Sequence, residues 1–156
     1  MDLHILAVGR LRGGPEAELI SDYLDRAGKT GRAHAIGPCA VIEVEDKKNR
    51  GRDAEAELLL GALPKDAALI ALDERGKTLS SPQLADTLAR YRDDGRRACC
   101  FAIGGADGHG KALLARADLK LSFGPMVWPH MLARAMIAEQ MFRAASILAG
   151  TPYHRV

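Results

Sequence analysis

Little in this sequence points to a membrane, a disulfide scaffold or binding by charge alone. Its three cysteines are too few for a disulfide framework, and their odd number favours reduced thiols in a cytoplasmic protein. No apolar run approaches the ~20 residues that span a bilayer, and the first residues lack a signal-peptide pattern. Lys and Arg number 22 against 20 Asp and Glu, and a formal net charge of +2 is low for binding naked nucleic acid. We therefore expect a cytoplasmic protein without a membrane segment.

The sequence also lacks the spacing of a metal site. None of the five histidines and three cysteines falls in a C-x-x-C or H-x-x-x-H pattern, so no metal is expected. Cys99 and Cys100 would point to opposite faces of one strand, which favours structural thiols. No serine lies in a G-x-S-x-G motif, and nothing indicates nucleophilic catalysis.

What is present is the composition and pattern of one folded domain. Hydrophobic residues make up 47% and charged residues 27% of the 156 residues, so we expect a single domain over residues 1–156. Short apolar runs alternate with segments of helical spacing, which predicts an α/β domain with a largely parallel sheet and helices on both faces. The expected strands are 3–9, 40–45, 67–73, 99–103 and 119–123, and the expected helices are 15–25, 53–63, 82–95, 111–116 and 129–149.

Several local features follow from the same pattern. Arg75 and Gly76 are expected to stop the third strand, and Ser81 to cap the next helix. The basic segment 47–52, KKNRGR, is expected to be a loop. The last helix is expected to place near one side Met131, Leu132, Ala135, Met136, Phe142, Ala145 and Leu148. Because ligands bind beyond the carboxyl ends of parallel strands, the candidate site lies in the loops after Gly9, Asp73, Ile103 and Phe123.

A glycine-rich stretch after the fourth expected strand comes close to a known phosphate-binding motif. Gly105–Lys111 reads GADGHGK, which matches the start of G-x-x-x-x-G-K-[ST]. The next residue is Ala112, which has no hydroxyl to hold a metal ion beside the phosphates. The motif also normally follows the first strand, so a nucleoside triphosphatase is not expected.

Three segments near the end of the chain allow both a structural and a functional interpretation. Glu139 and Arg143 are four residues apart, which suits a helix-stabilising ion pair or an arginine held for a phosphate. Residues 124–130, GPMVWPH, suit a rigid connection or a surface of fixed backbone groups that reads a base edge. Residues 152–156 suit a frayed tail, yet Tyr153, His154 and Arg155 could stack, move a proton and contact phosphate.

Taken together, these motifs resemble the RlmH family of SPOUT methyltransferases. The resemblance rests on IGG at 103–105, the Pro129–His130 pair, the run from Ala133 to Ala144, the LDERGK turn at 72–77 and the terminal PYHR, in order along the whole chain. It implies a parallel α/β sheet of the SPOUT fold with a deep C-terminal trefoil knot, and a homodimer. It further implies transfer of a methyl group from S-adenosylmethionine to N3 of a pseudouridine in large-subunit ribosomal RNA, on the ribosome.

The resemblance also implies the site residues. It places the cofactor contacts at Leu72, Gly104, Gly105, Phe123, Gly124, Pro125, Met126, Val127 and Trp128. The family commonly has a hydroxyl residue in place of Gly124 and threonine in place of Val127, so side-chain hydrogen bonds from these two positions are not expected. Trp128 replaces other large apolar residues.

For the chemistry, we expect the tail and the last helix to supply the catalytic side chains. An imide N3–H must lose its proton before the nitrogen attacks, and His154 is the candidate base. Arg155 and Arg143 would steady the developing anion or a phosphate, and Tyr153 would stack on the target base. His130 would orient the loop that precedes it. Two other classes stay open: a methyltransferase of the same superfamily acting on tRNA, and a ribosome-binding module without catalysis.

Overall fold

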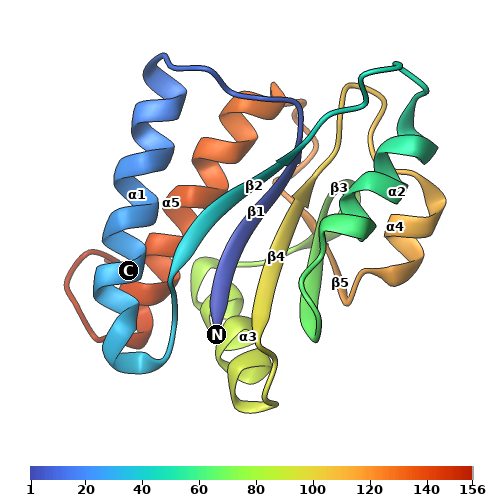
Figure 1. Ribbon diagram of the computed structural model, residues 1–156. Coiled ribbons are helices and arrows are strands. Elements are labelled where there is room, and N and C mark those ends of the chain that lie inside the picture. Colours follow the sequence, from blue (N-terminus) through green and yellow to red (C-terminus); the bar gives the residue numbers. More distant parts are fainter. Residues whose placement is uncertain (156) are drawn as a thin grey trace.

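The computed structural model describes residues 1–155 and is built on a parallel five-stranded sheet. The strand order is β2-β1-β4-β3-β5, and every neighbouring pair is parallel. The strands are β1 (Asp2–Val8), β2 (Cys39–Val44), β3 (Ala67–Thr78), β4 (Ala98–Ile103) and β5 (Leu119–Ser122). All carboxyl ends therefore share one edge, at the top of Figure 1. The prediction of a parallel α/β sheet is confirmed.

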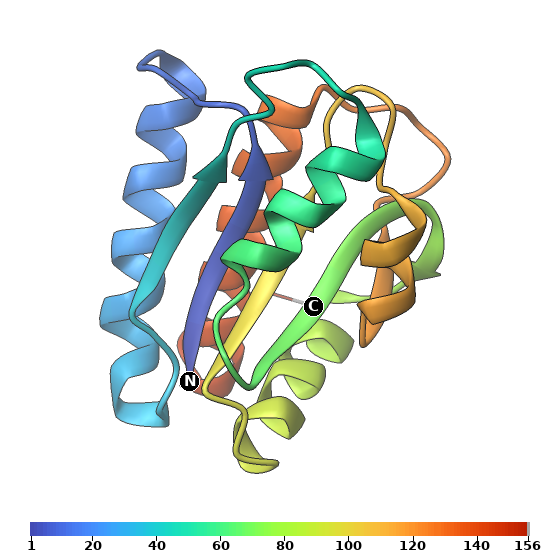
Figure 2. The same cartoon turned by 45° about the vertical axis from the view of Figure 1, so that its right-hand side comes forward.

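Helices cover both faces of the sheet (Figures 1 and 2). One face packs against α1 (Pro15–Gly31), α3 (Ser81–Asp93) and α5 (His130–Leu148), and the other against α2 (Arg52–Ala62) and α4 (Lys111–Arg116). A short 3-10 helix, Arg32–His34, follows α1. Each face has its own apolar core, and Cys99 lies in one while Cys100 lies in the other. The predicted opposite orientation of these two thiols is confirmed.

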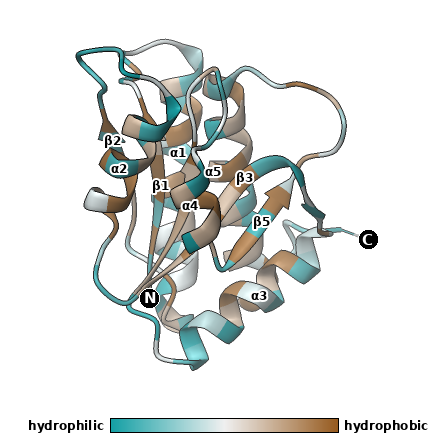
Figure 3. Cartoon of the chain, turned by 90° about the vertical axis from the view of Figure 1, so that its right-hand side faces the viewer, coloured by the Kyte–Doolittle hydropathy of each residue, from teal (hydrophilic) through white to brown (hydrophobic). Residues whose placement is uncertain are grey.

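Strand β3 runs past its predicted end. Arg75 and Gly76 do not stop it, because the chain re-pairs with β5 after a bulge: Leu121 is the partner of both Leu72 and Lys77. Gly76 makes this contact possible, since a Cβ there would lie 2.6 Å from the backbone carbonyl of Lys120. The hydrophilic end of β3, teal in Figure 3, thus crosses tightly over the edge strand.

The start of α3 also differs by one residue from the prediction. Ser80, not Ser81, is the N-cap, and its hydroxyl accepts from the Gln83 N–H while the Gln83 side chain accepts from the Ser80 N–H. This reciprocal capping box satisfies two backbone donors that the helix itself leaves free. The Ser81 hydroxyl instead donates to Gln140 Oε1 of α5 at 2.7 Å.

Helix α5 lies against both α1 and α3 after the chain has crossed from the sheet edge at β5 (Figure 1). Ala135, Phe142 and Ala145 are buried, whereas Met131 and Leu132 are 40% and 39% exposed. Of the seven residues expected near one side, the two at the start of the helix are thus exposed. None of the helices in residues 1–155 is long and apolar enough to cross a membrane. The trefoil knot stays a prediction.

Candidate functional site

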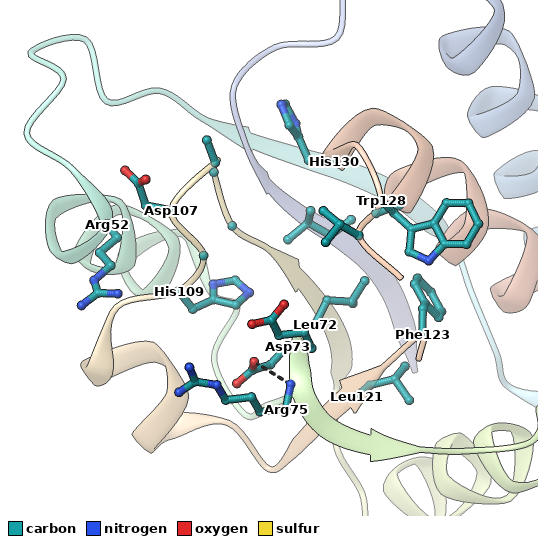
Figure 4. A pocket seen from close by; sticks show the side chains of 18 of the residues that line it. Arg52, Leu72, Asp73, Arg75, Asp107, His109, Leu121, Phe123, Trp128 and His130 are labelled. Carbon is teal, nitrogen blue, oxygen red and sulfur yellow. Dashed lines mark hydrogen bonds between the residues drawn. The ribbon is translucent and has the colours of Figure 1, made fainter. Parts of the chain in front are cut away.

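A pocket of about 480 Å³ opens at the carboxyl edge of the sheet (Figure 4). Three segments form most of its wall: Leu72–Arg75 within the second half of β3, Ile103–His109 at and after the end of β4, and residues between Leu121 and His130 at and after the end of β5. This volume is in the range of small-molecule sites. The predicted position of a site at the loops after Asp73, Ile103 and Phe123 agrees with this pocket, whereas the loop after Gly9 does not line it.

The pocket brings together nearly all the residues proposed to contact a cofactor. Its lining includes Leu72, Gly104, Gly105, Phe123, Gly124, Met126, Val127 and Trp128. Pro125 is the one predicted contact that does not line it. The resemblance thus selected residues that are far apart in sequence and adjacent in space, while their role in binding stays a prediction.

The glycine-rich loop after β4 needs its glycines for packing. A Cβ at Gly104 would lie 2.9 Å from the Gly108 carbonyl oxygen, and one at Gly105 would lie 2.8 Å from a carboxylate oxygen of Glu55. Gly108 has a φ of +76° and pairs with Gly105 in an isolated bridge. The loop therefore folds back on itself beside the pocket, which accounts for the glycines without a bound triphosphate.

His109, which sequence reasoning did not select, lies in the pocket wall beside Asp73 (Figure 4). Its Nε2 lies 3.1 Å from the carbonyl oxygen of Ala102, so the neutral ring places its proton there. Burial lowers the pKa of His109 below its ordinary value of 6.5, because desolvation penalises the imidazolium. The buried Nδ1 has no protein partner among the described residues. His109 is thus a neutral group that joins the loop to the end of β4.

The lining divides into an apolar and a charged part. Leu72, Leu121, Phe123 and Trp128 provide apolar and aromatic surface, as Figure 4 shows. The charged part holds acidic Asp73, Glu74 and Asp107 with basic Arg52 and Arg75, and Asp73 Oδ1 accepts from the Arg75 backbone N–H at 3.1 Å. Such a pocket suits a ligand with a flat apolar portion and a cationic portion. Residues 1–155 contain no cluster of three metal-ligating side chains.

Three of the four predicted catalytic residues gather near Glu139, in the middle of α5. Arg143 donates from Nε and Nη2 to Glu139 Oε1 at 3.0 and 2.6 Å, and the Tyr153 hydroxyl donates to the same oxygen at 2.9 Å. Arg143 Nη1 lies 3.3 Å from His154 Nδ1. Arg155 is exposed. The ion pair read from the spacing of Glu139 and Arg143 is confirmed.

The C-terminal segment is packed, so the expectation of a frayed tail was wrong. The Tyr153 ring lies 4.4 Å from the Phe142 ring centre, and the Arg143 guanidinium lies 4.7 Å above Tyr153. Burial and the hydrogen bond to Glu139 raise the pKa of Tyr153, and the same carboxylate raises the pKa of Arg143. Aromatic contact and a shared carboxylate therefore anchor the tail on α5.

The tail cluster and the pocket are separate within one chain. None of Arg143, Tyr153, His154 and Arg155 lines the pocket. His130 at the start of α5 borders the pocket, whereas Arg143 and Tyr153 contact Glu139, nine residues further along that helix. Nine residues of α-helix span about 14 Å. A neighbouring hollow shares Leu121, Phe123 and Gly124 with the pocket and reaches Glu139, but it contains none of the four predicted catalytic side chains.

A second functional candidate missed from the sequence is Arg134, whose side chain is only 3% exposed. Its guanidinium donates to Val8 O at 2.7 Å, Gly9 O at 2.8 Å and Glu43 Oε2 at 2.9 Å. The same Glu43 oxygen accepts from the Leu11 N–H at 2.7 Å. Arg134 therefore fixes the N-terminal part of α5, which directly follows the pocket loop, to the carboxyl end of β1.

Comparison with known proteins gives the family. The model of a family described as "Predicted SPOUT methyltransferase" matches residues 1–154. A protein of Dinoroseobacter shibae named "Ribosomal RNA large subunit methyltransferase H" is 62% identical over 156 residues, the full length of both chains. The chain belongs to the RlmH family of SPOUT methyltransferases. Relatives with the same printed name from Ruegeria pomeroyi and Ruegeria sp. are 62% and 60% identical, again over the full length of both chains. The family assignment made from the motifs is confirmed.

Proposed function

We propose that the protein transfers a methyl group from S-adenosylmethionine to N3 of a pseudouridine in 23S ribosomal RNA of the large subunit, on the assembled ribosome. Membership in the RlmH family supports the reaction class, and the relatives carry a name that specifies large-subunit ribosomal RNA. The observation that carries the proposal is the pocket at the carboxyl edge, where three loops assemble nearly every cofactor contact that the resemblance implies. We further propose a single cytoplasmic domain with the C-terminal knot.

The residues of the pocket fit S-adenosylmethionine. Bound there, it would supply an electrophilic methyl group on a sulfonium. Phe123, Trp128 and Leu72 offer apolar surface to the adenine ring, while Asp73 and Asp107 offer carboxylates to the cationic part. The tight packing at Gly104 and Gly105 lets the backbone of the β4 loop form the wall without side chains. These contacts would orient a ligand in the pocket.

Methyl transfer to nitrogen is an in-line displacement, so the protein mainly has to align two atoms and remove one proton. We assign proton removal to His154, stacking on the target base to Tyr153, and stabilisation of the imide anion to Arg143 and Arg155. Arg143 only donates hydrogen bonds, so it occupies the lone pair of His154 Nδ1 across 3.3 Å. For His154 to accept a proton at that atom, the imidazole must turn away from Arg143 when substrate binds.

The separation of tail and pocket leads us to propose a homodimer in which the tail of one subunit completes the pocket of the other. Apolar side chains on the pocket loop and the start of α5 are available for such an interface. Met126, Val127 and Trp128 are 70%, 88% and 40% exposed, and Met131 and Leu132 follow on the helix. Exposed apolar patches of this kind mark association surfaces.

Complementation tests the composite site. One variant lacks residues 152–156, and the other carries Phe123→Ala and Trp128→Ala in the pocket. Each alone is expected to be inactive, while a mixture of the two is expected to regain methyl transfer, because mixed dimers contain one intact tail beside one intact pocket. His154→Ala is expected to lower the turnover number strongly and leave the Kd for S-adenosylmethionine nearly unchanged. An inactive mixture in which mixed dimers are demonstrated contradicts the shared site.

A further inference from the structure

The basic segment that runs from the loop after β2 into the first residue of α2 has no assigned role in the function described so far, apart from Arg52 in the pocket wall. We call residues 47–52, with the sequence KKNRGR, the basic loop. It leaves the carboxyl end of β2, so it lies at the same edge of the sheet as the pocket (Figures 1 and 2). Its side chains are exposed and hydrophilic, and the loop is teal in Figure 3.

The basic loop has a fixed conformation that turns its charges outward. Asp46 and Asp53 flank the basic loop in sequence, and the side chain of Asp46 is only 5% exposed. Asp46 Oδ2 accepts from the Gly51 N–H at 3.0 Å, and its backbone carbonyl accepts from the Asn49 N–H at 3.0 Å. Gly51 and Asn49 have φ of +97° and +51°, as a tight turn requires. The carboxylate is thus used inside the loop, while Lys47 and Lys48 face solvent.

Most of the basic side chains in and beside the basic loop lack a carboxylate partner. Within residues 1–155, no ion pair forms at Lys47, Lys48 or Arg52, whereas Arg50 lies 3.7 Å from Asp46 and Arg10 lies 3.4 Å from Glu45. Charges that are held at a rigid position and left unpaired are available to an external anion. Because the net charge of the whole chain is only +2, this local concentration of positive charge is distinctive.

The basic loop directly adjoins the pocket, because Arg52 belongs to both (Figure 4). The pocket itself presents three carboxylates, Asp73, Glu74 and Asp107, against the two guanidinium groups of Arg52 and Arg75, and this acidic excess disfavours phosphate in its interior. Charge is therefore divided between an acidic pocket and a basic rim. A polyanion would contact the rim while an uncharged base enters the pocket.

We propose that Lys47, Lys48 and Arg52 bind backbone phosphates of the RNA strand that presents the target base. This inference rests on the proposed function, since it assumes an RNA substrate at the neighbouring pocket. Lysine side chains contact phosphate as point charges without reading sequence, so the basic loop positions the strand and does not select the base. Binding through these residues must weaken with salt, because each neutralised phosphate releases counterions.

The test compares two variants of the full-length protein with equal loss of charge. Lys47→Ala/Lys48→Ala removes two cations of the basic loop. Arg32→Ala/Lys65→Ala removes two exposed cations near the amino ends of the strands, on the opposite edge. The Kd for ribosomes that lack the methyl group is measured over a series of KCl concentrations, together with the Kd for S-adenosylmethionine and the rate of methyl transfer.

The basic-loop variant is expected to bind ribosomes on the order of tenfold more weakly at about 0.1 M KCl, with a slope of log K against log salt that is shallower by about 1.4. Its Kd for S-adenosylmethionine should match that of the wild type, and the control variant should match the wild type throughout. Equal ribosome affinities and slopes for the two variants, with the wild type active, overturn the inference alone. A wild type that transfers no methyl group to ribosomal RNA overturns the proposed function instead.

Discussion

Replacing Arg134 by methionine is expected to be among the most destabilising changes in the chain. Methionine keeps the length and the apolar part of the side chain but removes the donors to Val8 O, Gly9 O and Glu43. Losing one partner of a buried ion pair costs about 3–5 kcal/mol. Glu43 is 29% exposed and regains water, but the Val8 carbonyl lies in the core and loses a hydrogen bond worth about 1–3 kcal/mol. We expect a loss of about 3–5 kcal/mol in the free energy of unfolding.

The matched control is Lys29→Met, which removes a cation from an exposed pair. Lys29 Nζ lies 2.7 Å from Asp25, and the two side chains are 73% and 57% exposed, so we expect a loss below about 1 kcal/mol. Urea unfolding is followed by far-UV circular dichroism at one fixed protein concentration, because association of subunits also contributes to stability. The structural reasoning is refuted if Arg134→Met and Lys29→Met shift the free energy of unfolding by the same amount.

Two further changes test other parts of the site. Gly76→Ala places a Cβ 2.6 Å from the Lys120 backbone, so it should lower the free energy of unfolding by about 1–3 kcal/mol in urea unfolding. Because residues Asp73–Arg75 beside it form part of the pocket wall, it should also weaken S-adenosylmethionine binding in titration calorimetry. The control is Gly61→Ala in α2, where a Cβ would meet no atom within 4 Å, so alanine should raise the free energy of unfolding by about 0.5–1 kcal/mol. Equal effects of the two substitutions would contradict the close contact of Gly76 with the Lys120 backbone. Burial lowers the pKa of His109, so the unfolded chain takes up a proton near pH 6.5 while the folded chain does not. The free energy of unfolding therefore falls as the pH drops from about 7 to 5. His109→Asn keeps an N–H for the Ala102 carbonyl without titrating and should flatten that fall, whereas identical pH profiles would exclude His109 as its cause.

Local sequence signals were sufficient for most of the fold. Alternating strands and helices predicted the parallel sheet, and the bounds of α4, Lys111–Arg116, agree with the prediction at both ends. The end of β3 could not be predicted, because its continuation depends on pairing with β5 more than forty residues later in the chain. Ser80 as N-cap could have been found, since Gln83 stands three residues after it in the spacing of a capping box.

The site was predicted through a resemblance, and its local signals were weaker. The glycine-rich loop and the proline-containing loop did not by themselves predict a cofactor. The role of His109 could not be predicted either, because its partner, the Ala102 carbonyl, is a backbone group of another element. Arg134 had a signal: a lone arginine in the apolar stretch MLARAMIA of α5 must find partners if its surroundings are buried. The packed tail depends on contacts of Tyr153 with Phe142 and Glu139, which composition does not reveal.

The central claim is methyl transfer to one nucleotide of large-subunit ribosomal RNA. Its most direct test is incubation of the protein with labelled S-adenosylmethionine and ribosomes that lack the modification, followed by mapping of the labelled nucleotide. We predict label at N3 of a single pseudouridine in the large-subunit RNA. Label on tRNA, or binding to ribosomes without any transfer of label, would contradict the account.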